Sequence, residues 1–137
     1  MIYVFDASFI GGLIIPDEIK PLTQKMYSKI KNEDERHVPH LLWYEISNIF
    51  KNLTRSNRFT SSEVFRFFPL LTAFHLKTDI EGGINYSQKL LRLSTNYGLS
   101  CYDAAYLELA ERKKAVLCTL DHKLKLAAKK HGIKVIS

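Results

Sequence analysis

The amino-acid sequence predicts an α/β fold in which helices flank a parallel sheet, because three observations agree. Short apolar runs suited to buried strands alternate with longer helical patterns along the chain, as expected of βαβ units. No repeat, low-complexity stretch or linker divides the 137 residues, so we expect one domain over residues 1–137. Hydrophobic residues make up 46% and charged residues 25%, which is the composition of a globular domain with a sizeable core.

Apolar runs and proline positions define the elements expected in the first half. Ile2–Phe5 is a nearly continuous apolar run, typical of a strand that is covered on both faces. Pro16 and Pro21 suit the first turn of a helix, where proline is tolerated. The expected elements are, in order, a strand over 2–5, a helix over 8–14, a helix from Pro16 or Pro21 to about Lys31, a short strand over 37–39 and a helix over 41–55.

Capping signals divide the second half. Thr60–Glu63 has the capping-box pattern and Ser100–Asp103 resembles it, so each should open a helix. Pro69 should interrupt the first of these helices, and Gly98 and Gly132 suit helix ends. The expected elements are an interrupted helix from about 60, a strand over 74–77, a helix over 81–96, a helix over 100–113, a strand over 115–120, a helix over 121–131 and a fifth strand over 133–136.

The positive charge of the chain, formally +6, is concentrated near its C-terminal end. From Arg112 to Lys134 there are eight Lys and Arg residues and one acid, Asp121. A basic surface attracts phosphates, which makes nucleic acid a candidate partner, and a solvated helix face is the alternative. The lysines that we expect to contact RNA are Lys123, Lys125, Lys129 and Lys130.

The segments near the N-terminus and the two cysteines indicate a cytoplasmic protein. No window is long and apolar enough to span a bilayer, and Asp6 follows the first strand too early for a signal peptide. Cys101 and Cys118 are expected to be reduced, mostly buried thiols, with a disulfide or redox pair as the alternative, and two cysteines alone do not make a zinc site.

Four acidic residues are the candidate active site. Asp6 directly follows the first strand and Asp121 follows the strand over 115–120, so both should lie at the carboxyl edge of a parallel sheet. Glu45 lies about one turn into the helix after the second strand, and Asp103 lies in the first turn of its helix. Clustered carboxylates repel unless a cation holds them, and oxygen ligands suit Mg²⁺ or Mn²⁺. The pattern therefore predicts a divalent-metal site able to act on a phosphodiester.

Each acid also has a simpler interpretation. Asp6, Asp103 and Asp121 are each suited to cap a helix or to complement its dipole. Glu45 shares its helix face with Leu41, Leu42 and Ile49, where an ionised carboxylate needs a partner, so an ion pair with a Lys or Arg is its alternative.

Four stretches in order resemble a known family over essentially the whole chain. They are Val4–Ser8, Leu42–Ile46, Leu99–Leu107 and Leu117–Asp121. The sequence resembles the PIN-domain ribonucleases, most closely the VapC-type toxins of toxin–antitoxin modules. The resemblance implies a three-layer PIN-like α/β fold whose five-stranded parallel sheet has the order 3-2-1-4-5.

The resemblance also implies roles for individual residues. Asp6 and Asp103 would be the principal metal ligands, and Glu45 and Asp121 would complete the site. Ser8 and Thr119 would support it by hydrogen bonds, with helix or turn capping as their alternative.

The implied function is that of an Mg²⁺-dependent endoribonuclease toxin, with Mn²⁺ as a second suitable ion. A metal-activated water would hydrolyse the RNA, leaving a 5′-phosphate and a 3′-hydroxyl. A cognate antitoxin would inhibit the enzyme by laying a helix in a hydrophobic groove, and a homodimer is expected. The aromatic-rich residues suited to that groove, for which core packing is the alternative, are Phe65, Phe67, Phe68, Leu70 and Leu71.

Two other function classes were weighed against this one. A non-catalytic PIN-like module that binds RNA or a partner would keep the fold without cleavage. An aspartyl-phosphate phosphatase needs a second Asp at position 8, where this chain has Ser8, and a receiver domain needs a lysine beyond the last strand. The aspartyl-phosphate classes therefore fit poorly.

Overall fold

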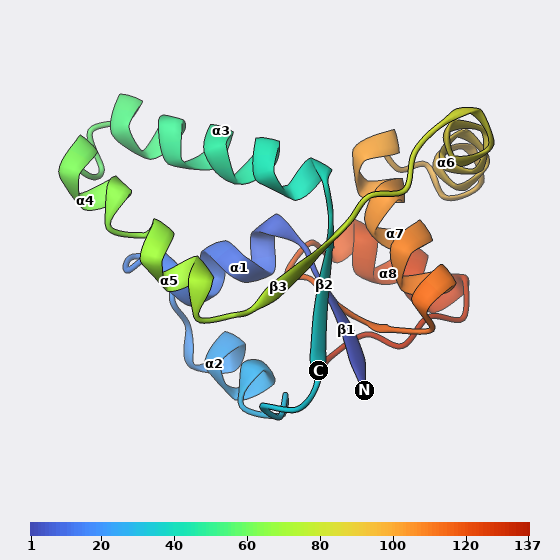
Figure 1. Cartoon of the computed structure of the whole chain (residues 1–137), viewed down its shortest axis with the longest axis horizontal. Helices are drawn as coiled ribbons and strands as arrows, with labels where there is room; N and C mark the ends of the chain where they lie inside the picture. The colour runs from blue at the N-terminus through green and yellow to red at the C-terminus, as the bar shows by residue number, and fades with distance from the viewer.

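A parallel sheet with strand order β3-β2-β1-β4 forms the centre of the protein in a computed structural model that describes residues 1–137. Figure 1 shows this sheet between two helical layers, with α1 to α5 on one side and α6 to α8 on the other. The strands are β1 (Ile2–Phe5), β2 (Glu35–Pro39), β3 (Leu76–Asp79) and β4 (Val116–Cys118). The helices are α1 (Ala7–Ile14), α2 (Pro21–Tyr27), α3 (Leu41–Arg55), α4 (Ser61–Phe65), α5 (Phe68–Thr72), α6 (Ile84–Tyr97), α7 (Cys101–Lys113) and α8 (His122–Lys130).

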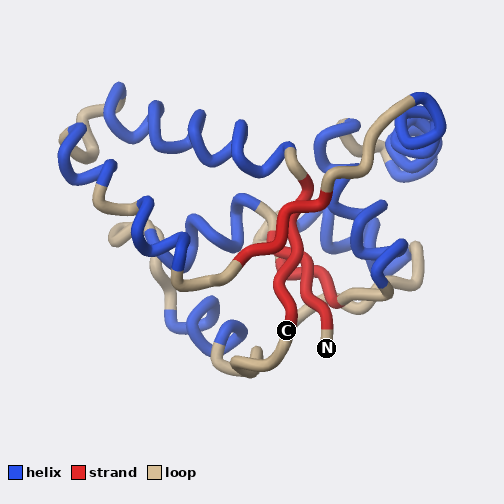
Figure 2. The backbone as a smooth tube through the Cα atoms, in the orientation of Figure 1, coloured by secondary structure: helices blue, strands red, loops and turns tan.

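The two central strands are apolar because both of their faces are covered. Val4, Phe5 and Leu117 are completely buried, and α7 packs against β1, β2 and β4. On the other side α1 packs against α2 and α3. The strands in Figure 2 therefore run through the middle of the molecule, as continuous apolar runs in parallel sheets do.

The register of the sheet brings distant segments to one edge. Phe5 of β1 pairs with Cys118 of β4, so the residues that follow each strand, Asp6 and Thr119, leave the sheet side by side. The Asp6 backbone N–H donates to the Cys118 carbonyl at 3.1 Å. Because all four strands are parallel, their carboxyl ends meet at this edge, opposite the two chain termini in Figure 1.

The fifth strand expected over 133–136 is reduced to one isolated parallel bridge between Leu117 and Val135. Leu117 donates to the Lys134 carbonyl and accepts from the Ile136 N–H. Residues of a strand direct their backbone groups alternately to its two neighbours, and the flanking Cys118 carbonyl bonds to the β1 side. Leu117 is therefore the one residue of the three-residue β4 that pairs with the segment expected as the fifth strand. That segment lies beside β4, as predicted.

Two other boundaries differ from expectation. The helix expected to reach Lys31 ends at Tyr27, where Ser28 bonds its hydroxyl to the Lys25 carbonyl and competes with the helical backbone. The strand expected over 74–77 begins at Leu76, because Phe74 and His75 still belong to the turn after α5: their N–H groups bond to the Leu71 and Thr72 carbonyls, and His75 has a positive φ of 50°.

The remaining elements agree with expectation to within a few residues. The predicted capping box at Thr60 is formed, and Gly98 ends α6 in the left-handed conformation. Pro69 interrupts the helix as predicted, since α4 and α5 are separate. No helix has both the length and the apolarity needed to cross a membrane.

Candidate active site at the carboxyl edge of the sheet

Asp6 is the buried centre of the acidic edge, with 5% of its surface exposed. It caps α1, since its Oδ1 accepts from the Phe9 backbone N–H at 2.9 Å. The same oxygen accepts from the Ser8 hydroxyl at 2.7 Å, and Oδ2 accepts from the Thr119 hydroxyl. Burial raises the pKa of Asp6 to about 6 despite these three donors, and the negative charge of Asp121 adds to the rise.

Thr119 and Ser8 connect the ends of β1 and β4. The fully buried Thr119 hydroxyl oxygen accepts from the Asp121 N–H at 3.0 Å while it donates to Asp6. The Ser8 oxygen accepts from the Leu120 N–H at 2.9 Å. Each hydroxyl therefore orients Asp6 and also holds the loop that carries Asp121.

Asp121 is the N-cap of α8, and its side chain is exposed. Its Oδ1 accepts from the Leu124 N–H at 2.8 Å. The capping interpretation thus holds for both Asp6 and Asp121, and it does not exclude a role at the site, because capping places both carboxyls at the sheet edge.

Glu45 is half-buried on α3, and its partner is a tyrosine. The Tyr106 hydroxyl of α7 donates to Glu45 Oε1 at 2.5 Å, and no Lys or Arg forms an ion pair with Glu45. Burial raises the pKa of Glu45, and the negative charge of Asp103 raises it further. The expected alternative, an ion pair, is therefore absent.

Asp103 lies in the first turn of α7 and is half-buried. The helix is capped by Ser100, whose hydroxyl accepts from the Asp103 N–H at 3.1 Å, so Asp103 itself is not the cap. Burial and the charge of Asp121 raise the pKa of the Asp103 carboxyl. Asp6 and Asp103 each respond to Asp121, and Glu45 responds to Asp103, so the four carboxyls form one electrostatic cluster.

The side chains of the acidic cluster are not arranged as a complete set of metal ligands. No group of three or more His, Cys, Asp or Glu side chains is arranged to hold a metal ion. Asp6 is buried and held by three donors, whereas Asp103 is half-exposed and Asp121 is exposed.

Of the basic residues expected to contact RNA, Lys123 is the one whose charge reaches the acids, because it lowers the pKa of Asp103. Lys129 and Lys130 lie in the last turn of α8, roughly 10 Å from Lys123 along the helix axis at 1.5 Å per residue. The four lysines therefore follow α8 rather than forming one patch.

Sequence reasoning missed Tyr106 as a site residue. It lies three positions after Asp103 on α7, so the two share a helix face, and it is almost completely buried. This spacing was the available signal, although its partner Glu45 lies 61 residues away and depends on how α7 packs.

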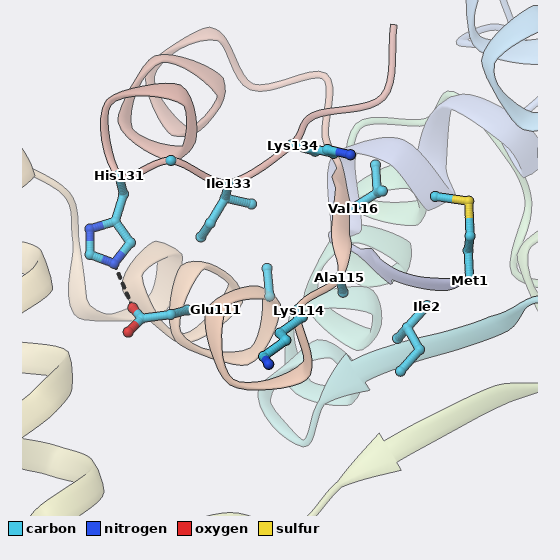
Figure 3. A pocket seen from close by; sticks show the side chains of 11 residues that line it. Met1, Ile2, Glu111, Lys114, Ala115, Val116, His131, Ile133 and Lys134 are labelled. Atoms are coloured by element: carbon cyan, nitrogen blue, oxygen red, sulfur yellow. Dashed lines mark hydrogen bonds and ion pairs between the residues drawn. The ribbon is translucent and has the colours of Figure 1, made fainter.

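A separate pocket of about 390 Å³ lies at the opposite edge of the sheet. Figure 3 shows it beside Ile2 and Val116, the first residues of β1 and β4, with a hydrogen bond between His131 and Glu111. Its lining contains none of the four acids, so it is not part of the candidate site.

The comparisons with known proteins agree with the fold. No protein-family profile matches the sequence. The chain is 28% identical over 121 residues to ribonuclease VapC3 of Pyrobaculum aerophilum, which covers 88% of this chain and 90% of that protein. The solved structure of PAE2754 from Pyrobaculum aerophilum is 25% identical, with a TM-score of 0.69 over 97% of this chain and 82% of that one.

More distant solved structures share the fold alone. VapBC2 from Rickettsia felis, solved with a DNA fragment of its promoter, has 13% identity and a TM-score of 0.67 over 98% of this chain and 97% of that one. Mycobacterium tuberculosis VapC20, a toxin that cleaves the sarcin–ricin loop, has 11% identity and a TM-score of 0.66 over 93% and 95%. The predicted PIN-like α/β fold and the predicted resemblance to the VapC-type PIN-domain ribonucleases are therefore confirmed.

Proposed function

We propose that this chain is a metal-dependent endoribonuclease, the toxin of a toxin–antitoxin module, with Asp6, Glu45, Asp103 and Asp121 as its active site. The observation that carries the proposal is that Asp6 and Asp121 follow the adjacent carboxyl ends of β1 and β4, while the charge of Asp121 raises the pKa of Asp6 and Asp103 and the charge of Asp103 raises that of Glu45. The similarity to ribonuclease VapC3 along nearly the whole chain supports the reaction class.

The donor set suits a hard cation. All four side chains offer oxygen, and their repulsion is relieved by positive charge, which favours Mg²⁺ and also suits Mn²⁺. Asp6 would be the fixed ligand, since Ser8, Thr119 and the Phe9 N–H hold it, and Asp103 would be the second principal ligand. When bound, such an ion compensates phosphate charge and acidifies a water molecule.

The protein's own side chains would divide the remaining tasks. Glu45, with its raised pKa, is suited to accept the proton of the attacking water, and Tyr106 fixes the position of its carboxyl. Lys123 is the best-placed lysine for a substrate phosphate, and Lys125, Lys129 and Lys130 would provide further phosphate contacts along α8.

An antitoxin would cover the exposed aromatic surface of α3 to α5. Phe65, Phe68 and Leu70 are exposed, whereas Phe67 and Leu71 are core residues. A pocket of about 210 Å³ between α3 and α4–α5 is lined in part by Phe65 and Phe68, which suits the apolar face of a helix. We further propose that the protein is a homodimer that acts on RNA in the cytoplasm.

Cleavage of RNA by the purified protein tests the proposal. We expect cleavage with Mg²⁺ or Mn²⁺, none with EDTA, and loss of activity in Asp6→Asn and Asp103→Asn. Asp17→Asn is the matched control, because Asp17 is an exposed acid paired with Arg58. A non-catalytic PIN-like module would bind RNA without cutting it, and cleavage that survives EDTA or Asp6→Asn would overturn the assigned site. Growth arrest on expression, relieved by a co-expressed antitoxin, tests the toxin role.

A further inference from the structure

A pocket of about 250 Å³ is lined by residues that are close in sequence to Glu45 and Asp103. His40 and Leu41 line it from the start of α3, the helix that carries Glu45, and Tyr102 lines it from the residue before Asp103. Tyr86 of α6 and Glu81 of the β3–α6 connection complete the far side, and Figure 1 shows α7 between the start of α3 and α6. A group held in this pocket would lie beside the first turns of α3 and α7, which carry Glu45 and Asp103.

The chemistry of the lining suits a flat uncharged ring rather than a phosphate. Tyr102 is 65% exposed although α7 is buried from Ala104 to Ala110, and His40 is also exposed. No Lys or Arg lines the pocket. Exposed aromatic rings beside a phosphate-cleaving site are the feature on which unpaired nucleobases stack. The volume is below the ~300–1,000 Å³ of pockets for drug-sized ligands, which fits a single base.

A carboxylate defines the polar end of the pocket. Asp79 is engaged by Arg112 at 2.6 Å and 3.1 Å, whereas Glu81 is exposed and takes part in no ion pair. An ionised carboxylate only accepts hydrogen bonds, so Glu81 selects a ring edge rich in N–H donors. Guanine alone among the four RNA bases presents two adjacent N–H donors on its Watson–Crick edge.

We propose that this pocket is a base-specificity subsite that holds one unpaired guanine beside the scissile phosphate, with Tyr102 as the stacking platform and Glu81 as the acceptor. The proposal rests on the proposed ribonuclease function and names the substrate feature that the site selects, a guanine in single-stranded RNA. It commits the enzyme to unpaired RNA, because a base held by its Watson–Crick edge cannot remain in a duplex.

Cleavage of an RNA pool with random sequence tests this subsite. We expect the wild-type ends to be enriched in guanine at one position flanking the cut. Tyr102→Ala should raise KM about tenfold and remove the enrichment, whereas Tyr102→Phe, which keeps the ring, should preserve both. Glu81→Gln should reduce the preference for guanine, because the amide offers one acceptor oxygen and an NH₂ donor in place of the carboxylate. Leu91→Ala, which removes an exposed α6 side chain outside the pocket, is the control and should match the wild type.

Binding of mononucleotides separates failure of the subsite from failure of the ribonuclease assignment. In EDTA, 5′-GMP should perturb the Tyr102 and Tyr86 NMR signals more strongly than AMP, CMP or UMP, and this difference should vanish in Tyr102→Ala. Cleavage without any base bias, or with a bias unchanged in Tyr102→Ala, overturns the subsite alone. Selective GMP binding without RNA cleavage retains the pocket and rejects the ribonuclease function.

Discussion

The Tyr106 hydroxyl of α7 donates a hydrogen bond to Glu45 of α3, which lies on the other side of the sheet edge and 61 residues earlier in the sequence. Tyr106 is almost fully buried, so its ring is fixed by the core while its hydroxyl reaches the acidic cluster. The contact connects the packing of α7 to the position and charge of one candidate catalytic carboxyl.

Removal of this hydroxyl should alter the pH dependence of cleavage. The hydrogen bond from Tyr106 lowers the pKa of Glu45, in opposition to burial, so Tyr106→Phe should raise that pKa further. A general base with a higher pKa is protonated at higher pH, so the acidic limb of kcat/KM should move upward and cleavage at pH 7 should fall about tenfold. Tyr97→Phe, which breaks a bond to His131 at the other end of the molecule, should leave the profile unchanged. An unshifted profile in Tyr106→Phe would separate Glu45 from proton transfer.

Thr119 should control metal affinity through Asp6. Thr119→Val keeps the shape of the buried side chain but removes the donor to Asp6 and the acceptor for the Asp121 N–H. Loss of a residue that orients a metal ligand weakens binding about 10- to 100-fold, so the Mg²⁺ concentration needed for half-maximal cleavage should rise by that factor. Thr119→Ser keeps the hydroxyl and should restore most of the affinity. Equal Mg²⁺ dependence in the Val variant and the wild type would contradict the proposed role.

The parts of the site that follow from local sequence were predictable, and those that depend on packing were not. Asp6 and Asp121 could be placed because each follows an apolar strand, and parallel strands share a carboxyl edge. The bounds of α3 agree with the helix expected over 41–55. The partner of Glu45 did not follow, since the helix pattern of α3 does not reveal which side chain of α7 faces it.

The strand boundaries also depended in part on packing that the local sequence does not reveal. The fifth strand was expected from the apolar run Ile133–Ile136, but β4 offers only Leu117 to pair with it. The start of β3 moved because Phe74 and His75 remain in the turn after α5, where Phe74 packs against Phe5 and Tyr27 in the core. In both segments tertiary contacts decided how far an apolar run became a strand.

The ion-pair network around Arg112 should be a major determinant of stability. Arg112 bridges Asp79 at the end of β3 and Glu108 of α7, and the Glu108 side chain is 3% exposed. Arg112→Ala leaves that carboxylate buried with only Lys89 nearby, at 3.8 Å, so unfolding free energy should fall by about 3 kcal/mol. Urea unfolding measures this loss.

A second variant distinguishes an unpaired buried charge from lost packing. Arg112→Ala combined with Glu108→Leu removes the buried carboxylate and should recover much of the lost stability. Arg58→Ala breaks a comparable but exposed pair with Asp17 and should have a much smaller effect. If the double variant is no more stable than Arg112→Ala, the charge of Glu108 is not the cause.

Asp6 should destabilise the protein when no divalent ion is bound. Its pKa rises from 3.8 to about 6 in the fold, which means that the fold disfavours the ionised form. This contribution is absent well below pH 3.8, where the carboxyl is protonated in both states, and it grows as pH rises from there to about 6. Above pH 6 it amounts to roughly 2–3 kcal/mol.

In EDTA at pH 7.5, Asp6→Asn should therefore raise the unfolding midpoint while it abolishes cleavage. Addition of Mg²⁺ should stabilise the wild type and not the variant, since the ion binds the carboxylate. If Asp6→Asn instead lowers the midpoint in EDTA, the hydrogen bonds from Ser8, Thr119 and Phe9 outweigh the burial of the charge, and the acidic edge is a stabilising network and not a site held ready for a cation.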